Sequence, residues 1–369
     1  MIITELQQLY ATHPNVEGMC KLLKDDSVRH LYCSGLCASA ASLFSSVLVQ
    51  RAECPFVFIL GDLEEAGYFY HDLTQILGTG QVLFFPSSFR RAIKYGQKDA
   101  ANEILRTEVL SRLQKGEEGL CVVTYPDALA EKVVSRKELG DKTLKLHVGE
   151  KVDMDFVTEV LRSYGFEYVD YVYEPGQYAV RGSIIDVFSF SSEFPFRIDF
   201  FGDEVESIRT FEVESQLSRE KKEEIVIVPD LSRSLEQGGN GGMVSFLGFL
   251  RPDTLLAMRD FLWLRERIQA VHDESLTAQA IAACEAEENG AISLEGKLID
   301  GGEFTLRALD FRRMEFGTKP TGTPDATVAF STVAQPIFHK NFDLVAESFR
   351  DYLSRNYTLY ICSDSLKQT

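Results

Sequence analysis

The sequence is short of positive charge. It has 38 lysine and arginine residues against 56 aspartate and glutamate residues, which gives a formal net charge of −18. A surface of that charge repels a polyanion unless cations are concentrated locally, so direct nucleic-acid binding is disfavoured. The 369 residues are 45% hydrophobic and 11% aromatic, a globular composition with enough chain for two or three domains.

The sequence also lacks a cluster of metal-binding side chains. Its seven cysteines are scattered without a C-x-x-C pair, and its six histidines are dispersed. This pattern predicts neither a disulfide framework nor a metal site, and it fits a reducing compartment.

Long apolar runs are absent as well. No run approaches the ~20 residues of a membrane span, and the start, MIITELQQLY, has no basic segment followed by an apolar one. We therefore expect a cytoplasmic protein that has no membrane partner.

A lysine is missing from a loop of the kind that often binds phosphate. GLCASAAS, Gly35 to Ser42, lies between a predicted strand and a predicted helix, and has the length of the pattern G-x-x-x-x-G-K-[S/T]. In that frame Ala40 replaces the second glycine, Ala41 replaces the lysine, and Ser42 keeps the hydroxyl. The residues alone leave two interpretations: an ordinary turn of small residues, or a nucleotide site that has lost its function. Without the cation, we expect no ATP binding or hydrolysis by this chain.

Strand and helix patterns alternate up to about residue 150. Apolar runs such as HLYCS, PFVFIL, QVLFF and GLCVVTY are separated by segments with helical periodicity. This alternation predicts an α/β fold, a parallel sheet with helices on both faces, whose first segment is 1–150.

The pattern then changes to one of antiparallel strands. After a predicted helix in MDFVTEVLRSYGF, polar and apolar residues alternate and are interrupted at Pro175-Gly176, Phe194-Pro195 and Gly202-Asp203. We expect a small α+β insert at 151–216. The charged run SREKKEE and the stretch EQGGNGG then indicate a solvated connection and a flexible loop.

The α/β pattern resumes over 217–330, where Phe261, Trp263 and Leu264 are predicted core residues of a helix. A helix and the strand-like TLYICSD follow in 331–369. This last part is expected to be the start of a further α/β domain, in a chain cut from a longer protein.

One stretch carries a specific motif. From Tyr178 to Phe211 the sequence reads YAVRGSIIDVFSFSSEFPFRIDFFGDEVESIRTF. It resembles the insert domain that bacterial transcription-repair coupling factors share with the excision-repair subunit UvrB. The motif of that domain begins with R-G-x, two hydrophobic residues, D, a hydrophobic residue and F. After a short spacer it continues with R, a hydrophobic residue, D/E, a hydrophobic residue, F, any residue, D/E and E. Nine positions match in order and spacing, and similarity extends through GLCASAAS upstream and AQPIFHKNFDLV downstream.

The resemblance implies the amino-terminal, UvrB-homology region of a coupling factor. Its phosphate loop would be a degenerate copy, so Gly35, Ala40, Ala41 and Ser42 would be inactive. Only about fifteen residues, 86–100, separate a predicted strand from the next helix, which leaves no room for the hairpin with which UvrB clamps damaged DNA. The segment itself would need no cofactor and would not be an enzyme, whereas the parent would use ATP and Mg in a translocase motor elsewhere.

The resemblance also implies a partner. In that family the insert binds UvrA and brings nucleotide excision repair to a stalled RNA polymerase, while RNA polymerase and double-stranded DNA are contacted by other parts of the protein. The contact residues carry over to Arg181, Arg197 and Asp199, which we expect side by side on an exposed face. One position departs, since Ala179 stands where UvrB members often have a second arginine.

The residues by themselves also allow structural roles. Arg181 could pair with Asp186 or Glu174, and Arg197 with Asp199. Gly182 is predicted to meet a backbone requirement near a strand bend, and Asp186 to be a structural partner rather than a catalyst.

Two further charged groups have simple structural interpretations. The acidic pair Asp62 and Glu64 is expected to cap a helix. The basic cluster of Arg90, Arg91, Lys94 and Lys98 is expected to be a solvated loop, with nucleic-acid contact as the alternative. For the whole chain, the alternatives are an active UvrB-type nucleotide-binding subunit or an adaptor on the same fold.

Overall fold

The structure, a computed structural model, describes most of the chain. The described residues are 3–52, 54–88, 100–231, 243–275, 277, 296–333, 336–339 and 341–360. They divide into two compact units, Met1–Ser331 and Thr332–Thr369. The basic cluster at 90–98, most of the 86–100 connection and the EQGGNGG stretch lie outside the described residues.

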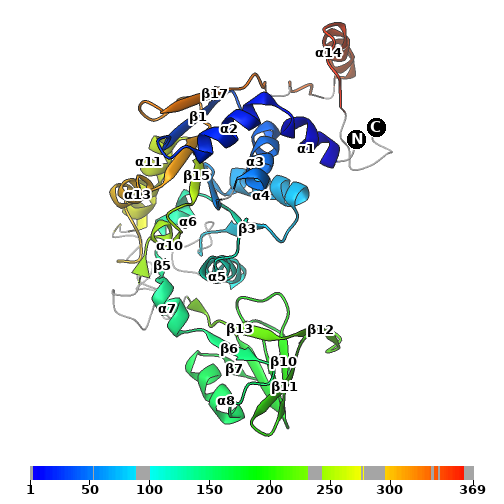
Figure 1. The fold of residues 1–369 in the computed structure, drawn as a ribbon, viewed down its shortest axis with the longest axis vertical. Coiled ribbons are helices and arrows are strands. Elements are labelled where there is room, and N and C mark those ends of the chain that lie inside the picture. The colour runs from blue at the N-terminus through cyan, green and yellow to red at the C-terminus, as the bar shows by residue number, and fades with distance from the viewer. Residues whose placement is uncertain are drawn as a thin grey trace. The chain divides into compact units, whose positions relative to one another are not determined.

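A seven-stranded parallel sheet forms the centre of the first unit (Figure 1). Its order is β17-β1-β16-β15-β2-β4-β3, and all neighbours are parallel. The strands are β1 (His30–Ser34), β2 (Phe56–Ile59), β3 (Val82–Phe85), β4 (Cys121–Thr124), β15 (Leu255–Met258), β16 (Arg312–Glu315) and β17 (Ala326–Ala329). Strands such as FVFI and CVVT are buried along their whole length, as expected where helices cover both faces. The predicted α/β fold is confirmed.

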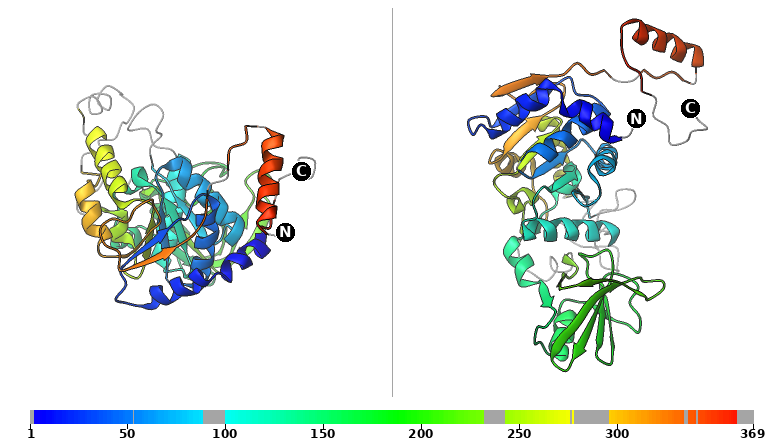
Figure 2. Two further views of the ribbon diagram at one scale, coloured as in Figure 1. Left: turned by 90° about the horizontal axis from the view of Figure 1, so that it is seen from above. Right: turned by 45° about the vertical axis from the view of Figure 1, so that its right-hand side comes forward.

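Helices flank this sheet on both sides. Figure 2 (left) shows the yellow and gold α11 (Phe261–Ser275) and α13 (Gly301–Ala308) on one side, and the blue α3 (Ser39–Arg51) and α4 (Leu63–Leu77) on the other. Among the described residues, the other helices of the α/β part are α1 (Ile3–Ala11), α2 (Pro14–Lys24), α5 (Ala100–Lys115), α6 (Pro126–Ala130), α7 (Arg136–Asp141) and α10 (Phe246–Phe249). The short strand β5 (Val133–Val134) pairs with β14 (Met243–Val244).

Two predictions about this part can be compared with the structure. Asp62 is the N-cap of α4 and accepts a hydrogen bond from the backbone N–H of Glu65, so the capping role is confirmed for Asp62, whereas Glu64 lies in the first turn. On α11, Phe261 and Leu264 are buried, but Trp263 is 44% exposed, so its assignment to the core is wrong. Trp263 is adjacent to Leu264 in sequence, and a helix turns neighbouring side chains about 100° apart, so only part of this apolar run faces the sheet.

The insert has a sheet of its own. Six strands lie in the order β12-β11-β10-β9-β8-β7 and are covered by α8 (Met154–Ser163). They are β7 (Glu167–Tyr168), β8 (Gln177–Arg181), β9 (Ile184–Val187), β10 (Phe196–Phe201), β11 (Glu204–Phe211) and β12 (Ser218–Lys222). Separately, β6 (Leu144–His147) pairs antiparallel with β13 (Glu224–Ile227).

The charged run after Leu217 does not form the expected solvated connection. Its residues SREKK are strand β12, which pairs antiparallel with β11 at the edge of the sheet. Charged side chains suit an edge strand, because they stay in water while the backbone pairs on one side only. The strands of this region therefore continue past residue 216.

The second unit contains α14 (Phe342–Ser354), none of whose residues is buried. The predicted strand TLYICSD is not a strand in residues 358–360, and its remainder lies outside the described residues.

Candidate functional site

The sheet of the insert has two different faces, because successive strand residues point to opposite sides. One packs on α8, and the other carries charged side chains beside a small buried cluster of Val172, Ala179, Phe188 and Phe211. Ile185, Ile198 and Ile208 are buried on the first face against Val157 and Leu161 of α8. Figure 2 (right) shows α8 beside the green strands. The intervening residues of the same strands form the other face.

We call this second face the arginine face and define it by Arg181, Asp186, Arg197, Asp199, Phe201 and Arg209. The strand register brings these residues together. Arg197 of β10 lies opposite Asp186 of β9 and Arg209 of β11, while Asp199 and Arg181 both lie opposite Ile184. The three residues that the family resemblance indicated therefore share one face.

Asp186 lies at the centre of the ion pairs on this face, and its side chain is 1% exposed. Arg197 binds it in a bidentate manner, with Nε 2.8 Å from Oδ1 and Nη2 2.9 Å from Oδ2. Arg181 donates to the same Oδ2 through Nη2. Hydrogen bonding to Asp186 raises the pKa of the Arg197 guanidinium. The predicted structural role of Asp186 and its pairing with Arg181 are confirmed.

The alternative in which Arg197 pairs with Asp199 does not match the structure. Asp199 instead accepts a hydrogen bond from the hydroxyl of Ser183 at 3.1 Å, and its Oδ2 lies 3.6 Å from Nη2 of Arg209. The reason is the register: Arg197 and Asp199 are on one strand, two residues apart, whereas Asp186 is directly opposite Arg197.

The two arginines differ in exposure. The guanidinium of Arg197 lies 4.5 Å from the ring centroid of Phe211 and donates to the carbonyl of Gln216 at 3.2 Å, which leaves its side chain 15% exposed. The guanidinium of Arg181 lies 5.1 Å from the ring centroid of Tyr171, and its side chain is 36% exposed. Arg181 is thus accessible, while Arg197 is mostly covered and supports Asp186.

Phe201 is an accessible residue on this face that the sequence reasoning did not single out. Its side chain is 78% exposed. The alternation along β10, which buries Phe196, Ile198 and Phe200, puts Phe201 on the side of Arg197 and Asp199. That alternation was the signal that could have identified it.

Glycine turns hold the ends of these strands. Gly182 has φ +61° in the two-residue connection between Arg181 and Ile184, and Gly202 has φ +66° in the connection between Phe201 and Glu204. Positive φ favours glycine, so the predicted backbone role of Gly182 is confirmed. Both turns adjoin an exposed residue of the arginine face.

The degenerate loop is packed closely within the protein. Gly35 has φ +75°, and a Cβ atom at this position would overlap the carbonyl oxygen of Phe330, whose N–H donates to Ser34 at 2.8 Å. Ala41 is buried, and the hydroxyl of Ser42 lies 2.6 Å from Oδ2 of Asp72. These contacts give the small residues and the serine structural roles.

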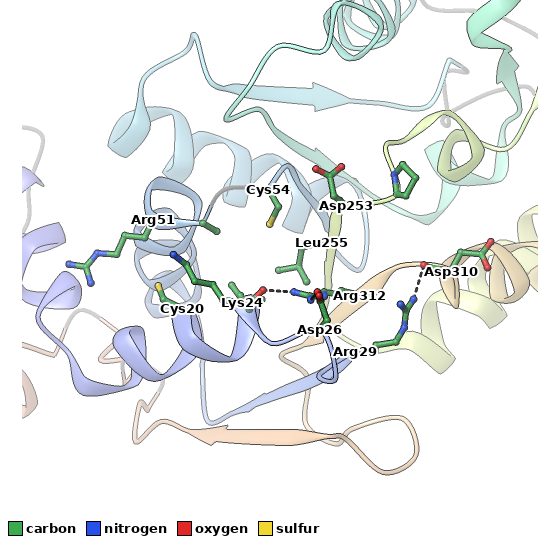
Figure 3. Close-up of a pocket in the computed structure, with 13 residues that line it drawn as sticks. Cys20, Lys24, Asp26, Arg29, Arg51, Cys54, Asp253, Leu255, Asp310 and Arg312 are labelled. Atoms are coloured by element: carbon green, nitrogen blue, oxygen red, sulfur yellow. Dashed lines mark hydrogen bonds and ion pairs between the residues drawn. The ribbon is translucent and has the colours of Figure 1, made fainter.

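A pocket of about 510 Å³ lies near the amino ends of β1, β2, β15 and β16, at the other end of the strands from the degenerate loop (Figure 3). Arg312 in this pocket donates to the carbonyl of Leu23 and pairs with Asp26, and Arg29 donates to the carbonyl of Asp310 at 2.8 Å. Two more cations, Lys24 and Arg51, are in the last turns of α2 and α3, where positive charge complements the helix dipole. Structural contacts thus account for Arg29 and Arg312, and helix position accounts for Lys24 and Arg51.

The described ranges contain neither a metal-binding cluster nor a membrane-spanning helix. In these ranges no group of three or more histidine, cysteine, aspartate or glutamate side chains could hold a metal ion. Nor does any helix in the described part of the chain have the length and apolar character needed to cross a bilayer.

Comparison with known proteins identifies the insert. Residues 144–232 match the UvrB interaction domain. The chain is 28% identical over 237 residues to the transcription-repair-coupling factor of Bacillus subtilis, a match that covers 62% of this chain and 20% of that protein. It is 29% identical over 196 residues to the Escherichia coli factor, covering 53% and 17%, and 31% identical over 155 residues to the Haemophilus influenzae factor, covering 42% and 13%. The matches thus span a fifth or less of these relatives, and the predicted resemblance to a region of transcription-repair coupling factors is confirmed.

Proposed function

We propose that this chain is the UvrA-recruiting module of a transcription-repair coupling factor. In this role the insert binds UvrA and thereby links a stalled RNA polymerase to nucleotide excision repair. ATP-driven DNA translocation, with ATP and Mg, belongs to parts of the parent protein outside this chain. The observation that carries the proposal is the arginine face, where buried Asp186 fixes two arginines near an exposed phenylalanine within the matched domain.

The geometry of this face suits protein docking. Asp186 and the ring of Tyr171 hold the Arg181 guanidinium in place, so less side-chain entropy is lost when a partner binds. Phe201 offers apolar area, and aromatic and arginine side chains are the groups that most often dominate binding energy. Asp199, 25% exposed, adds an opposite charge that favours one docking register. In this arrangement Arg181 and Phe201 touch UvrA directly, whereas Arg197 acts mainly by positioning Asp186.

Replacing Arg181 or Phe201 with alanine is expected to weaken UvrA binding. Truncation of such a residue costs about 2 kcal/mol, or roughly thirtyfold in Kd. The measurement is calorimetric titration of the 369-residue chain with purified UvrA, with circular dichroism to check folding.

Matched controls lie on α8, across the sheet from the arginine face. Arg162 and Phe156 are exposed there, and their alanine variants should bind within about twofold of the parent chain. Unchanged affinity in a folded Arg181→Ala, Phe201→Ala double variant would exclude this face as the docking site.

We also propose that the segment is a non-catalytic scaffold. The position of the phosphate-loop lysine is occupied by Ala41, which is buried, and the Ser42 hydroxyl already contacts Asp72. No side chain at Ala40 or Ala41 supplies the charge that nucleotide phosphates require.

The chain is therefore expected not to bind Mg-ATP in a calorimetric titration. The combined change of Ala40→Gly and Ala41→Lys should not by itself create an ATPase, since hydrolysis also needs acids and arginines from a motor. Saturable binding at micromolar ATP would favour the alternative of an active UvrB-type subunit. Absence of UvrA binding would favour an adaptor with another partner.

A further inference from the structure

A row of cations crosses the arginine face from strand to strand. Arg197 of β10 lies opposite Arg209 of β11, and Arg209 lies opposite Lys221 of edge strand β12. We call Arg197, Arg209 and Lys221 the cationic row. It reaches two strands beyond β10, the strand of Arg197 and Asp199 that the family resemblance indicates.

The row stands out against the charge of its surroundings. Residues 151–222 contain fifteen acidic and eight basic side chains, yet three of these cations occupy directly opposed positions on neighbouring strands. Like charges in such positions destabilise a sheet, and the ion pair with Asp186 gives a structural reason for Arg197 alone, not for Lys221.

The charges of the row are only partly neutralised within the protein. Arg197 is paired with Asp186, and Arg209 has the 3.6 Å contact with Asp199. Nε of Arg209 is buried and has no hydrogen-bond partner among the described residues. Lys221 is exposed and makes no ion pair within the described part of the chain. The positive charge that is not neutralised by a carboxylate therefore increases from Arg197 to Arg209 and on to Lys221 of the edge strand.

We propose that the cationic row extends the docking face to β12 and receives an acidic strip on the surface of UvrA. This inference rests on the proposed function and names the chemistry of the partner surface. Charge complementarity selects an acidic protein surface, because the acidic remainder of the insert would repel the longer polyanion of a nucleic acid. Exposed pairs of this kind act on the association rate and are screened by salt.

Two neighbouring lysines make a matched test. Lys221 lies opposite Arg209, on the same side of the sheet as the arginine face. Lys222 lies opposite Ile208 on the other side of the sheet, with its Nζ 2.8 Å from a carboxylate oxygen of Glu220. We expect Lys221→Glu to weaken UvrA binding about fivefold at low salt, mainly through slower association. The loss should become smaller as salt is raised to about 0.5 M, because the screening length there is only about 4 Å. Lys222→Glu should stay within about twofold of the parent chain.

The outcomes separate this inference from the proposed function. If Arg181→Ala weakens UvrA binding but the two lysine variants bind equally, the cationic row is not part of the interface and only this inference fails. If the folded parent chain does not bind UvrA, the proposed function fails and this inference fails with it. A short DNA duplex that binds the chain in a Lys221-dependent manner, with UvrA binding unaffected by Lys221→Glu, would assign the row to nucleic acid and overturn the proposal.

Discussion

Replacing Asp186 with alanine is expected to lower the free energy of unfolding of the insert by about 3–5 kcal/mol. The change leaves the mostly covered guanidinium of Arg197 without its carboxylate and removes the group that orients Arg181. Urea unfolding followed by circular dichroism measures the loss. UvrA affinity should fall as well, because Arg181 loses its fixed geometry.

Asp199→Ala is the matched control on the same face. Its carboxylate is more exposed and makes one longer contact with an arginine, so its removal should cost less than about 1 kcal/mol. Similar losses for the two variants would mean that burial and bidentate pairing give Asp186 no special structural role.

Replacing Gly35 with alanine is expected to destabilise the main sheet by about 3 kcal/mol or more. The new Cβ would overlap the backbone carbonyl of Phe330, and φ at this position is +75°, a conformation that costs other residues about 1–3 kcal/mol. Trp263 is the single tryptophan and belongs to α11 beside this sheet, so its fluorescence in a urea titration reports the loss.

Gly78→Ala separates the two causes. Gly78 ends α4 with φ +88°, but a Cβ there would meet no atom within 4 Å. It should therefore cost only the conformational penalty of about 1–3 kcal/mol, because glycine is nearly the only residue that adopts φ +88° with ψ 158°. Equal destabilisation by the two changes would show that contact with Phe330 is unimportant.

The parallel sheet could be predicted because its signal is local. HLYCS, PFVFIL and GLCVVTY are continuous apolar runs that alternate with helices, and strands covered on both faces need such runs. Strand β12 has no such signal. SREKK lies at the edge of the sheet, where only the pairing of its backbone with β11 makes it a strand, and that pairing depends on the tertiary structure.

The candidate site shows the same division between local and non-local information. The motif identified Arg181, Arg197 and Asp199, and strand alternation places them on one face. The partner of Arg197 depends on which residue of β9 lies opposite it, and the sequence does not encode that register in a local pattern. The different exposure of the two arginines depends on Phe211 and Tyr171, which come from other parts of the insert.

The strand order has a consequence for synthesis on the ribosome. Strand β1 is made early, but both of its neighbours, β16 and β17, lie after the insert in the sequence. Leu31 therefore cannot pair until Met314 and Ala326 have been synthesised. The insert between β6 and β13 finds its partners within a much shorter stretch of chain. Contacts between near residues close faster than distant ones, so the insert is expected to fold while β1 is still unpaired. The emerging chain would then present the arginine face before the sheet that carries it is complete.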